Sequence, residues 1–211
     1  MNVLVVKANN RPDGISTRMY NTFLENIQDN KEVNVNTYDL FEEDTPYFGQ
    51  DFFNALGKLQ EGTALNDTEQ RILDAKQKAK DVISAADVVV VAFPLWNFTI
   101  PAKLQTFIDY LAEAGFSFRY TAEGNLEPLL TDKRVILLNA RGGNYSTPSM
   151  APIEMSLNYM RNIFGGHFGM NIKDEVVIEG HAAAPDQAEE IIQAGLEKVS
   201  EVASNLSYQD A

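Results

Sequence analysis

Four consecutive valines, Val88 to Val91, constrain the fold more than any other stretch of this sequence. The run has no polar alternation, which is typical of a strand covered by helices on both faces. It ends at Phe93-Pro94, and after Pro101 apolar residues recur at helical spacing. The stretch therefore predicts a strand of a parallel sheet, a loop at the strand's carboxyl end, and a helix.

Similar apolar runs recur along the whole chain. Those that predict strands are Val3 to Val6, Val33 to Leu40, Val88 to Val91, Val135 to Leu138 and Val176 to Ile178. Val33 to Leu40 alternates in period two, which favours an edge position. Helical patterns separate the runs, so right-handed β-α-β units are expected. The sequence predicts one α/β domain over residues 1–211: a doubly wound five-stranded parallel sheet with helices on both faces. The strand order expected for it is 2-1-3-4-5, a common order among doubly wound sheets.

Several connecting elements are also expected. They are a helix from Asn66 to Asp87, a hairpin that begins at Phe116 to Thr121, a helix from Ser149 to Phe164 and a helix from Pro185 to Asn205. Asn66 and Glu69 have the spacing of a capping box, and Gly165-Gly166 is expected to end the third of these elements.

The segment from Phe41 to Leu65 is too long for an ordinary connection, and long loops in compact domains are often functional. Its acidic triplet, residues 42–44, is expected to be a solvated turn. A helix is expected over Asp51 to Leu59. The aromatic residues Tyr47, Phe52 and Phe53 could cover a pocket or a partner subunit.

Charge and composition exclude several classes of function. The chain has 17 basic and 30 acidic residues and a net charge of −13, so nucleic acid and anionic membrane surfaces would repel it. It contains no cysteine, so a thiolate metal site and a cysteine nucleophile are excluded. His181 has no partner at ligand spacing, and no metal site is expected. The first residues lead directly into a strand pattern, which predicts a cytoplasmic protein.

The loop after the first strand has the features of an anion site. Ser16 or Thr17 is expected to cap a helix, which would place free backbone amides and the positive end of the helix dipole together. Phosphates bind at such positions. A simple capped helix would give the same pattern, and the loop has neither a GxGxxG nor a GxxxxGK[ST] motif.

The loops after the third and fourth strands would suit a planar ligand. Trp96 and Phe98 offer aromatic surface, and Gly142-Gly143 permits a close backbone approach. A core lid and a tight turn would explain the same residues. In the predicted strand order the first, third and fourth strands are neighbours, so one ligand could contact all three loops.

The nine residues from Phe93 to Pro101 resemble, in order and spacing, the flavin-ring loop of the FMN-dependent NADH-azoreductase and quinone reductase family. The motif Ala140-Arg141-Gly142-Gly143 is similar to the same family's loop along the flavin edge. The resemblance extends over essentially the whole chain and implies a flavodoxin-like fold with bound FMN. It also implies NADH as electron donor, quinones or azo compounds as acceptors, and a homodimer with FMN at the subunit interface.

The resemblance implies a role for particular residues. Those expected to bind FMN are Asn9, Ile15, Ser16, Thr17, Pro94, Leu95, Trp96, Asn97, Phe98, Ala140, Arg141, Gly142, Gly143 and Tyr145. Phe118 and Tyr120 are expected in the substrate pocket. No side chain is assigned a catalytic role, because the flavin carries the chemistry. An electron-carrier flavodoxin is the alternative function. A response-receiver module fits less well, because residues 7–10 lack its acidic cluster.

Overall fold

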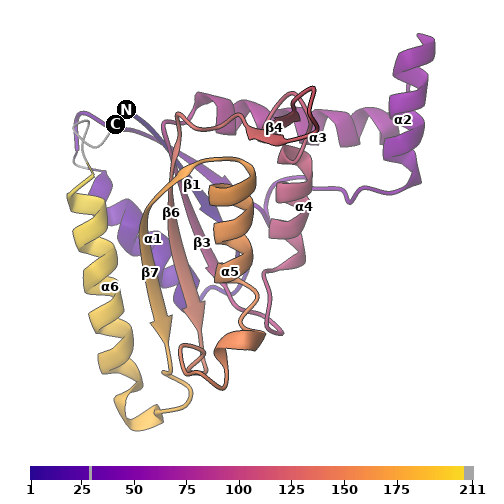
Figure 1. The fold of residues 1–211 in the computed structure, drawn as a ribbon. Coiled ribbons are helices and arrows are strands. Elements are labelled where there is room, and N and C mark those ends of the chain that lie inside the picture. The colour runs from indigo at the N-terminus through magenta and orange to yellow at the C-terminus, as the bar shows by residue number, and fades with distance from the viewer. Residues whose placement is uncertain (29, 207–211) are drawn as a thin grey trace.

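The computed structural model describes residues 1–28 and 30–206 of the chain. Its central sheet has five parallel strands in the order β2-β1-β3-β6-β7, which confirms the predicted order (Figure 1). The strands are β1 (Asn2–Lys7), β2 (Asn34–Asp39), β3 (Val88–Pro94), β6 (Arg134–Arg141) and β7 (Asn171–Glu179). β2 lies at an edge, as its alternating pattern predicts.

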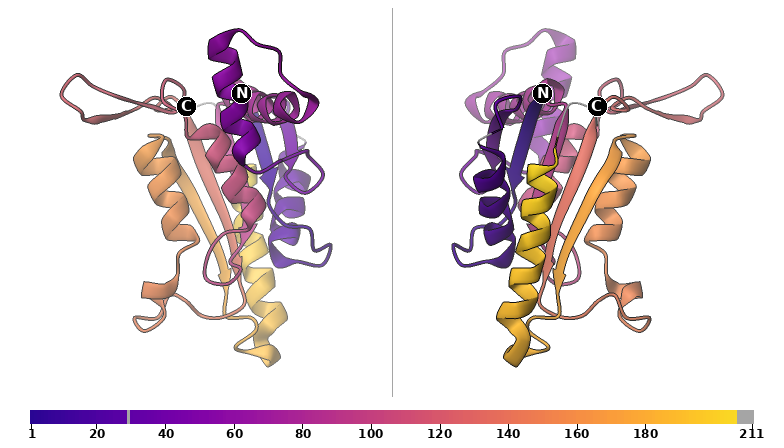
Figure 2. Two further views of the ribbon diagram at one scale, coloured as in Figure 1. Left: turned by 90° about the vertical axis from the view of Figure 1, so that its right-hand side faces the viewer. Right: turned by 90° about the vertical axis from the view of Figure 1, so that its left-hand side faces the viewer.

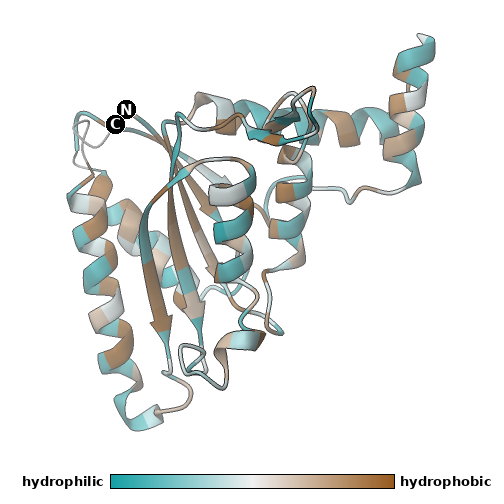
Figure 3. Cartoon of the chain, viewed as in Figure 1, coloured by the Kyte–Doolittle hydropathy of each residue, from teal (hydrophilic) through white to brown (hydrophobic). Residues whose placement is uncertain are grey.

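Helices cover both faces of the sheet, and the valine run of β3 shows why. Val88 and Val90 enter the core beneath α1 (Ile15–Ile27) and α6 (Ala188–Ser204). Val89 and Val91 enter the opposite core, and all four side chains are fully buried. The helices on that second face are α3 (Asp67–Ala85), α4 (Ala102–Leu111) and α5 (Leu157–Met160). Figure 3 shows apolar residues along the central strands and in stripes on the covering helices.

The long connection after β2 contains α2 (Gln50–Glu61), which confirms the expected helix there. Residues 42–61, which we call the arm, extend away from the sheet (Figures 1 and 2). The acidic triplet is more than a solvated turn, because Glu43 pairs with Lys78 of α3 at 2.5 Å and Asp44 with Arg71 at 2.6 Å. These ion pairs fix the base of the arm.

α3 begins with the predicted capping box. The Asn66 side chain accepts a hydrogen bond from the Glu69 amide at 2.9 Å, and the Glu69 carboxylate accepts one from the Asn66 amide at 2.8 Å. Glu69 also binds Lys58 of α2 at 2.8 Å. The start of α3 is therefore tied to the arm.

The predicted hairpin forms from β4 (Phe118–Tyr120) and β5 (Leu126–Pro128), a pair that we call the flap. It projects from the amino end of β6, and it points in a different direction from the arm (Figures 1 and 2). The Phe118 ring packs on His167 at a centroid distance of 4.4 Å. This contact fixes the base of the flap.

The prediction of a single helix over Ser149 to Phe164 is wrong. The segment forms a 3-10 turn at Ala151–Ile153, then α5, which continues as a π-helix over Arg161–His167, through both glycines. The cause is Glu154, whose carboxylate accepts hydrogen bonds from the Ser156 and Leu157 amides at 2.9 and 2.8 Å. A buried carboxylate at this point starts a new helix there. The last expected helix is a 3-10 turn at Pro185–Gln187 followed by α6.

Replacing Glu154 with glutamine should lower stability in a pH-dependent manner. Burial disfavours the carboxylate, but the hydrogen bonds from Ser156, Leu157 and Asn158 outweigh burial and lower the pKa of Glu154. The ionised Glu154 therefore stabilises the folded state fully at pH values above the ordinary glutamate pKa of about 4.3. This contribution is lost as the pH falls through the lowered pKa of the folded protein. We expect a loss of about 1–3 kcal/mol at pH 7 that shrinks in acid, measured by urea unfolding. An equal loss at every pH would contradict this role.

Candidate cofactor site

A cavity of about 270 Å³ lies at the carboxyl ends of β1, β3, β6 and β7. It is bordered by the three loops that the sequence singles out and by the loop after β7. The predicted cofactor-binding residues that line it are Asn9, Ile15, Ser16, Pro94, Leu95, Trp96, Ala140, Arg141 and Gly142. The fold therefore brings most of the predicted residues into one cavity.

The other predicted residues do not line this cavity. Thr17 lies in the first turn of α1, and Asn97, Phe98, Gly143 and Tyr145 lie in the loops after β3 and β6, but none of the five is among the lining residues. Phe118 and Tyr120 lie in the flap at the opposite, amino end of the sheet (Figure 1). Within one chain, the substrate-pocket pair and the cavity are thus separated by the length of the sheet.

Four lining residues were missed from the sequence: Arg11, Gly14, His181 and Ala182. Arg11 and Gly14 lie in the same loop as predicted residues. Predicting the whole loop as part of the site would therefore have included them. His181 and Ala182 follow the last strand. The rule that ligands bind beyond the carboxyl ends of strands applies to β7 as well and would have found them.

The start of α1 forms one end of the cavity. Gly14 is the N-cap residue in an extended conformation, so the expectation that Ser16 or Thr17 caps the helix is wrong. Arg18 makes the first intrahelical bond, to the Gly14 carbonyl at 3.0 Å. The three preceding amides, residues 15–17, are left for another acceptor. No acidic residue lies in the first turn, so the positive end of the dipole is not neutralised.

Asn9 orients the Ser16 hydroxyl. The Asn9 side-chain oxygen accepts a hydrogen bond from the Arg11 amide at 3.0 Å, which directs its Nδ2 group to Ser16 Oγ at 2.8 Å. Because Ser16 Oγ accepts from Asn9, its own proton is free to be donated. Ser16 is fully buried and Asn9 nearly so. The site thus offers one hydroxyl and three amides as donors for a phosphate.

A strained turn follows β3. The Trp96 and Thr99 backbones exchange hydrogen bonds at 2.9 and 3.0 Å, while Asn97 and Phe98 have positive φ angles of 49° and 71°. Two successive residues with positive φ define a type I′ turn, which normally favours Asn-Gly. A phenylalanine at the second position costs of order 1–3 kcal/mol, and such strain occurs most often at functional sites. The turn exposes 43% of Phe98.

The loops after β3 and β6 are bonded together. The Leu95 amide donates to the Ala140 carbonyl at 2.8 Å, and the rings of Phe98 and Tyr145 meet edge to face at 6.3 Å. Beyond them, the Ala182 amide donates to the Gly142 carbonyl at 2.9 Å. The loops after β3, β6 and β7 are therefore joined to one another at the candidate site.

The side chain of Arg141 is bound to other protein groups. Its Nε lies 2.9 Å from the Glu179 carboxylate, its Nη1 3.6 Å from Glu154, and its Nη2 donates to Ser146 at 3.1 Å. Glu179 also accepts a hydrogen bond from the Tyr145 amide at 2.9 Å. The guanidinium therefore joins the loop after β6 to the end of β7 and to the turn before α5.

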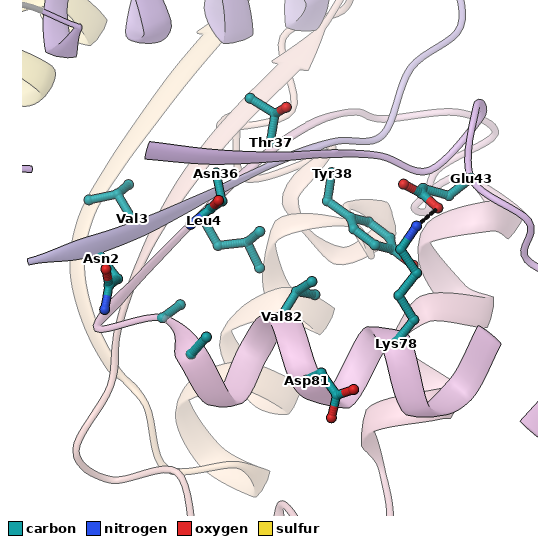
Figure 4. A pocket seen from close by; sticks show the side chains of 12 residues that line it. Asn2, Val3, Leu4, Asn36, Thr37, Tyr38, Glu43, Lys78, Asp81 and Val82 are labelled. Carbon is teal, nitrogen blue, oxygen red and sulfur yellow. Dashed lines mark hydrogen bonds and ion pairs between the residues drawn. The ribbon is translucent and has the colours of Figure 1, made fainter. Parts of the chain in front are cut away.

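A larger cavity of about 450 Å³ lies elsewhere, between β1, β2 and α3 (Figure 4). Lys78 and Glu43 form an ion pair at its border, and Asp81 adds a second acidic group. Its helical wall is the carboxyl half of α3, where the dipole disfavours anions. The smaller cavity is thus the better phosphate site.

None of the helices in residues 1–28 and 30–206 combines the length and apolar character needed to cross a membrane.

Comparisons with known proteins show the family of the chain. A family model described as a flavodoxin-like fold matches residues 1–203. FMN-dependent NADH:quinone oxidoreductase 3 of Bacillus cereus is 46% identical and enzyme 1 of Bacillus subtilis 44%, each match covering 96% of this chain and 98% of the relative. The crystal structure of an azoreductase from Bacillus anthracis has 43% identity and a TM-score of 0.86, covering 97% of this chain and 99% of that one. The chain therefore belongs to the flavodoxin-like family that includes the FMN-dependent NADH:quinone oxidoreductases and azoreductases.

Proposed function

We propose that this protein is an FMN-dependent oxidoreductase that takes hydride from NADH and reduces quinones and azo compounds. The observation that carries the proposal is the convergence of the loops after β1, β3 and β6 on one cavity that has the start of α1 at one end. FMN, when bound, supplies the hydride and electron chemistry. The chain's own residues bind it, orient it and exclude water.

The phosphate of FMN is assigned to the start of α1. Hydrogen bonds to a charged group contribute about 1.5–3 kcal/mol each, so the free amides and the Ser16 hydroxyl are sufficient for micromolar affinity without a lysine. Asn9 holds that hydroxyl in place through its 2.8 Å bond.

The flavin ring is assigned to the loops at Pro94 to Phe98 and Ala140 to Gly143. The Leu95 and Trp96 amides donate to protein carbonyls, so they are not free to face a ligand. In the part of the chain that the structure describes, the amides of Asn97, Gly142 and Gly143 have no protein acceptor. We assign to them the stabilisation of negative charge that develops on a reduced ring, with Gly142 lining the cavity and Asn97 and Gly143 next to lining residues.

The protein is further proposed to act as a homodimer. Its proposed location is the cytoplasm, where NADH is present. A cavity of 270 Å³ is below the usual range of about 300–1,000 Å³ for a complete ligand site. Exposed apolar side chains lie at both ends of the sheet: Tyr47, Phe53, Leu59 and Tyr120 on the arm and flap, and Phe98 and Met155 near the cavity. In a two-fold dimer, the arm and flap of each copy would cover the cavity of the other.

A subunit-mixing experiment tests this shared site. Gly14→Ala impairs the cavity, whereas Tyr120→Ala changes an exposed flap side chain far from the cavity of its own chain. Both variants are expected to have low activity, and refolding them together should restore about a quarter of the wild-type rate, because each mixed dimer contains one intact site. Full activity of Tyr120→Ala alone, or no recovery on mixing, would contradict the shared site.

The colour and the NADH oxidation of the purified protein distinguish the proposed enzyme from an electron-carrier flavodoxin. The protein is expected to be yellow and to oxidise NADH when menadione or an azo dye is added. A yellow protein without NADH oxidation would be a flavodoxin-type electron carrier. A colourless protein that does not take up FMN would refute both functions.

A further inference from the structure

His181 occupies the fourth loop at the candidate cofactor site. It follows β7, next to Gly180, whose φ of 82° turns the chain sharply. The loop is held against the loop after β6 by two hydrogen bonds, from Gly180 to Gly143 at 3.2 Å and from Ala182 to Gly142 at 2.9 Å. His181 lines the same cavity as Ser16 and Trp96. Its place is therefore fixed by backbone contacts and not by its own side chain.

The imidazole of His181 has polar atoms without a use inside the chain. Its Nδ1 atom is buried and has no hydrogen-bond partner among the described residues. Burial lowers the pKa of His181, so at pH 7 the ring is neutral and carries one N–H donor and one lone pair. Buried polar atoms are normally paired, and each unpaired one in a native structure indicates a ligand, a water or strain.

The position of the ring limits where that partner can be. His181 Nε2 lies 3.9 Å from the point where a Cβ on Gly142 would stand. The Ala182 Cβ lies 3.1 Å from the same point, so His181 and Ala182 both lie close to the Gly142 backbone that is assigned to the flavin. The other histidine, His167, differs because its ring packs between Phe118 and Phe168. Of the two, only His181 combines a cavity position with an unpartnered ring nitrogen.

We propose that His181 is a flavin-binding residue whose imidazole hydrogen-bonds FMN directly and sets part of the affinity. The inference rests on the proposed function and adds a residue to it from a fourth loop. The imidazole needs no proton transfer for this role, since one donor and one acceptor are already present in its neutral form.

Two variants of similar size separate hydrogen bonding from packing. His181→Gln keeps a donor and an acceptor, whereas His181→Leu keeps only bulk. FMN affinity is measured by quenching of flavin fluorescence as apoprotein is added. The leucine variant is expected to bind FMN about tenfold more weakly than the wild type, and the glutamine variant within about threefold of it. Unfolding midpoints of the apoproteins show whether either variant is damaged.

A second measurement needs no substitution at this position. The chain has only two histidines, so the imidazole ¹⁵N resonances of labelled apoprotein can be assigned with a single His167→Gln sample. On addition of FMN, the His181 nitrogens are expected to shift. Wild-type protein that fails to bind FMN would refute the proposed function. Wild-type protein that binds FMN with unchanged His181 resonances, or a leucine variant of undiminished affinity, would refute this inference alone.

Discussion

Replacing Gly14 with alanine is expected to weaken FMN binding by about ten- to a hundredfold, equivalent to one or two lost hydrogen bonds to a charged group. The backbone of Gly14 is extended, with φ −66° and ψ 140°, so any residue could adopt it. Position 14 excludes a larger residue because there is no space for a Cβ atom. A Cβ there would overlap Asn9 Nδ2 and lie 3.1 Å from the Arg11 carbonyl oxygen.

The Asn9 side chain cannot move away from such a Cβ without losing a hydrogen bond. It is 2% exposed and hydrogen-bonded at both ends of its amide, so displacement breaks the bond that orients the Ser16 hydroxyl. Gly166→Ala is the matched control, because a Cβ at Gly166 meets nothing within 4 Å and this residue lies outside the cavity, the arm and the flap. Fluorescence titration should give wild-type affinity for the control. Equal affinities for the two variants would refute the assigned phosphate site.

Replacing Arg141 with methionine should cause the largest loss of stability, about 3–5 kcal/mol, because it leaves buried carboxylates without their cation. The side chains of Arg141 and Glu154 are each 5% exposed, and that of Glu179 is 19% exposed. FMN content should fall with stability, since the same guanidinium holds the loop that carries Gly142. Guanidinium-chloride unfolding and the flavin-to-protein absorbance ratio measure the two effects.

Arg161→Met provides the comparison for this effect. Arg161 forms an ion pair with Glu175 at 2.5 Å, but its side chain is 44% exposed. Exposed ion pairs contribute about 0–1 kcal/mol, so this variant should be nearly as stable as the wild type. Adding Glu179→Gln to Arg141→Met should recover part of the lost stability. An Arg141 variant as stable as the Arg161 variant would show that burial of the pair has no energetic consequence.

The burial of β3 could be predicted from its valine run, because every residue of the strand is buried. The alternating sequence of β2 indicated its edge position, although Tyr38 is the one buried residue of that strand. The strand order itself was that of the flavodoxin-like fold. The grouping of three loops followed from strand order alone, since carboxyl ends of parallel strands share one edge. Details of those loops did not follow. The helix start at Gly14 depends on the contact between Asn9 and Arg11, and no local pattern encodes the positive φ of Phe98.

Side-chain contacts that the sequence pattern does not reveal account for the other differences. The break before α5 arises from Glu154, a residue that in the sequence looks like an ordinary polar position in a helical pattern. The role of Arg141 was assigned by its motif, yet its side chain binds carboxylates 13 and 38 residues away along the chain. The flap residues were placed correctly in a hairpin, but only three-dimensional structure shows that they lie at the far end of the sheet.

A crystal structure of the protein with FMN tests the central claim most directly. The account predicts one flavin in the smaller cavity, with its phosphate on the amides of residues 15–17 and its ring against Trp96 and Gly142. A second copy should place Tyr120 over that ring. Flavin bound instead in the larger cavity between β2 and α3, or contacting only one of the three loops, would contradict the account.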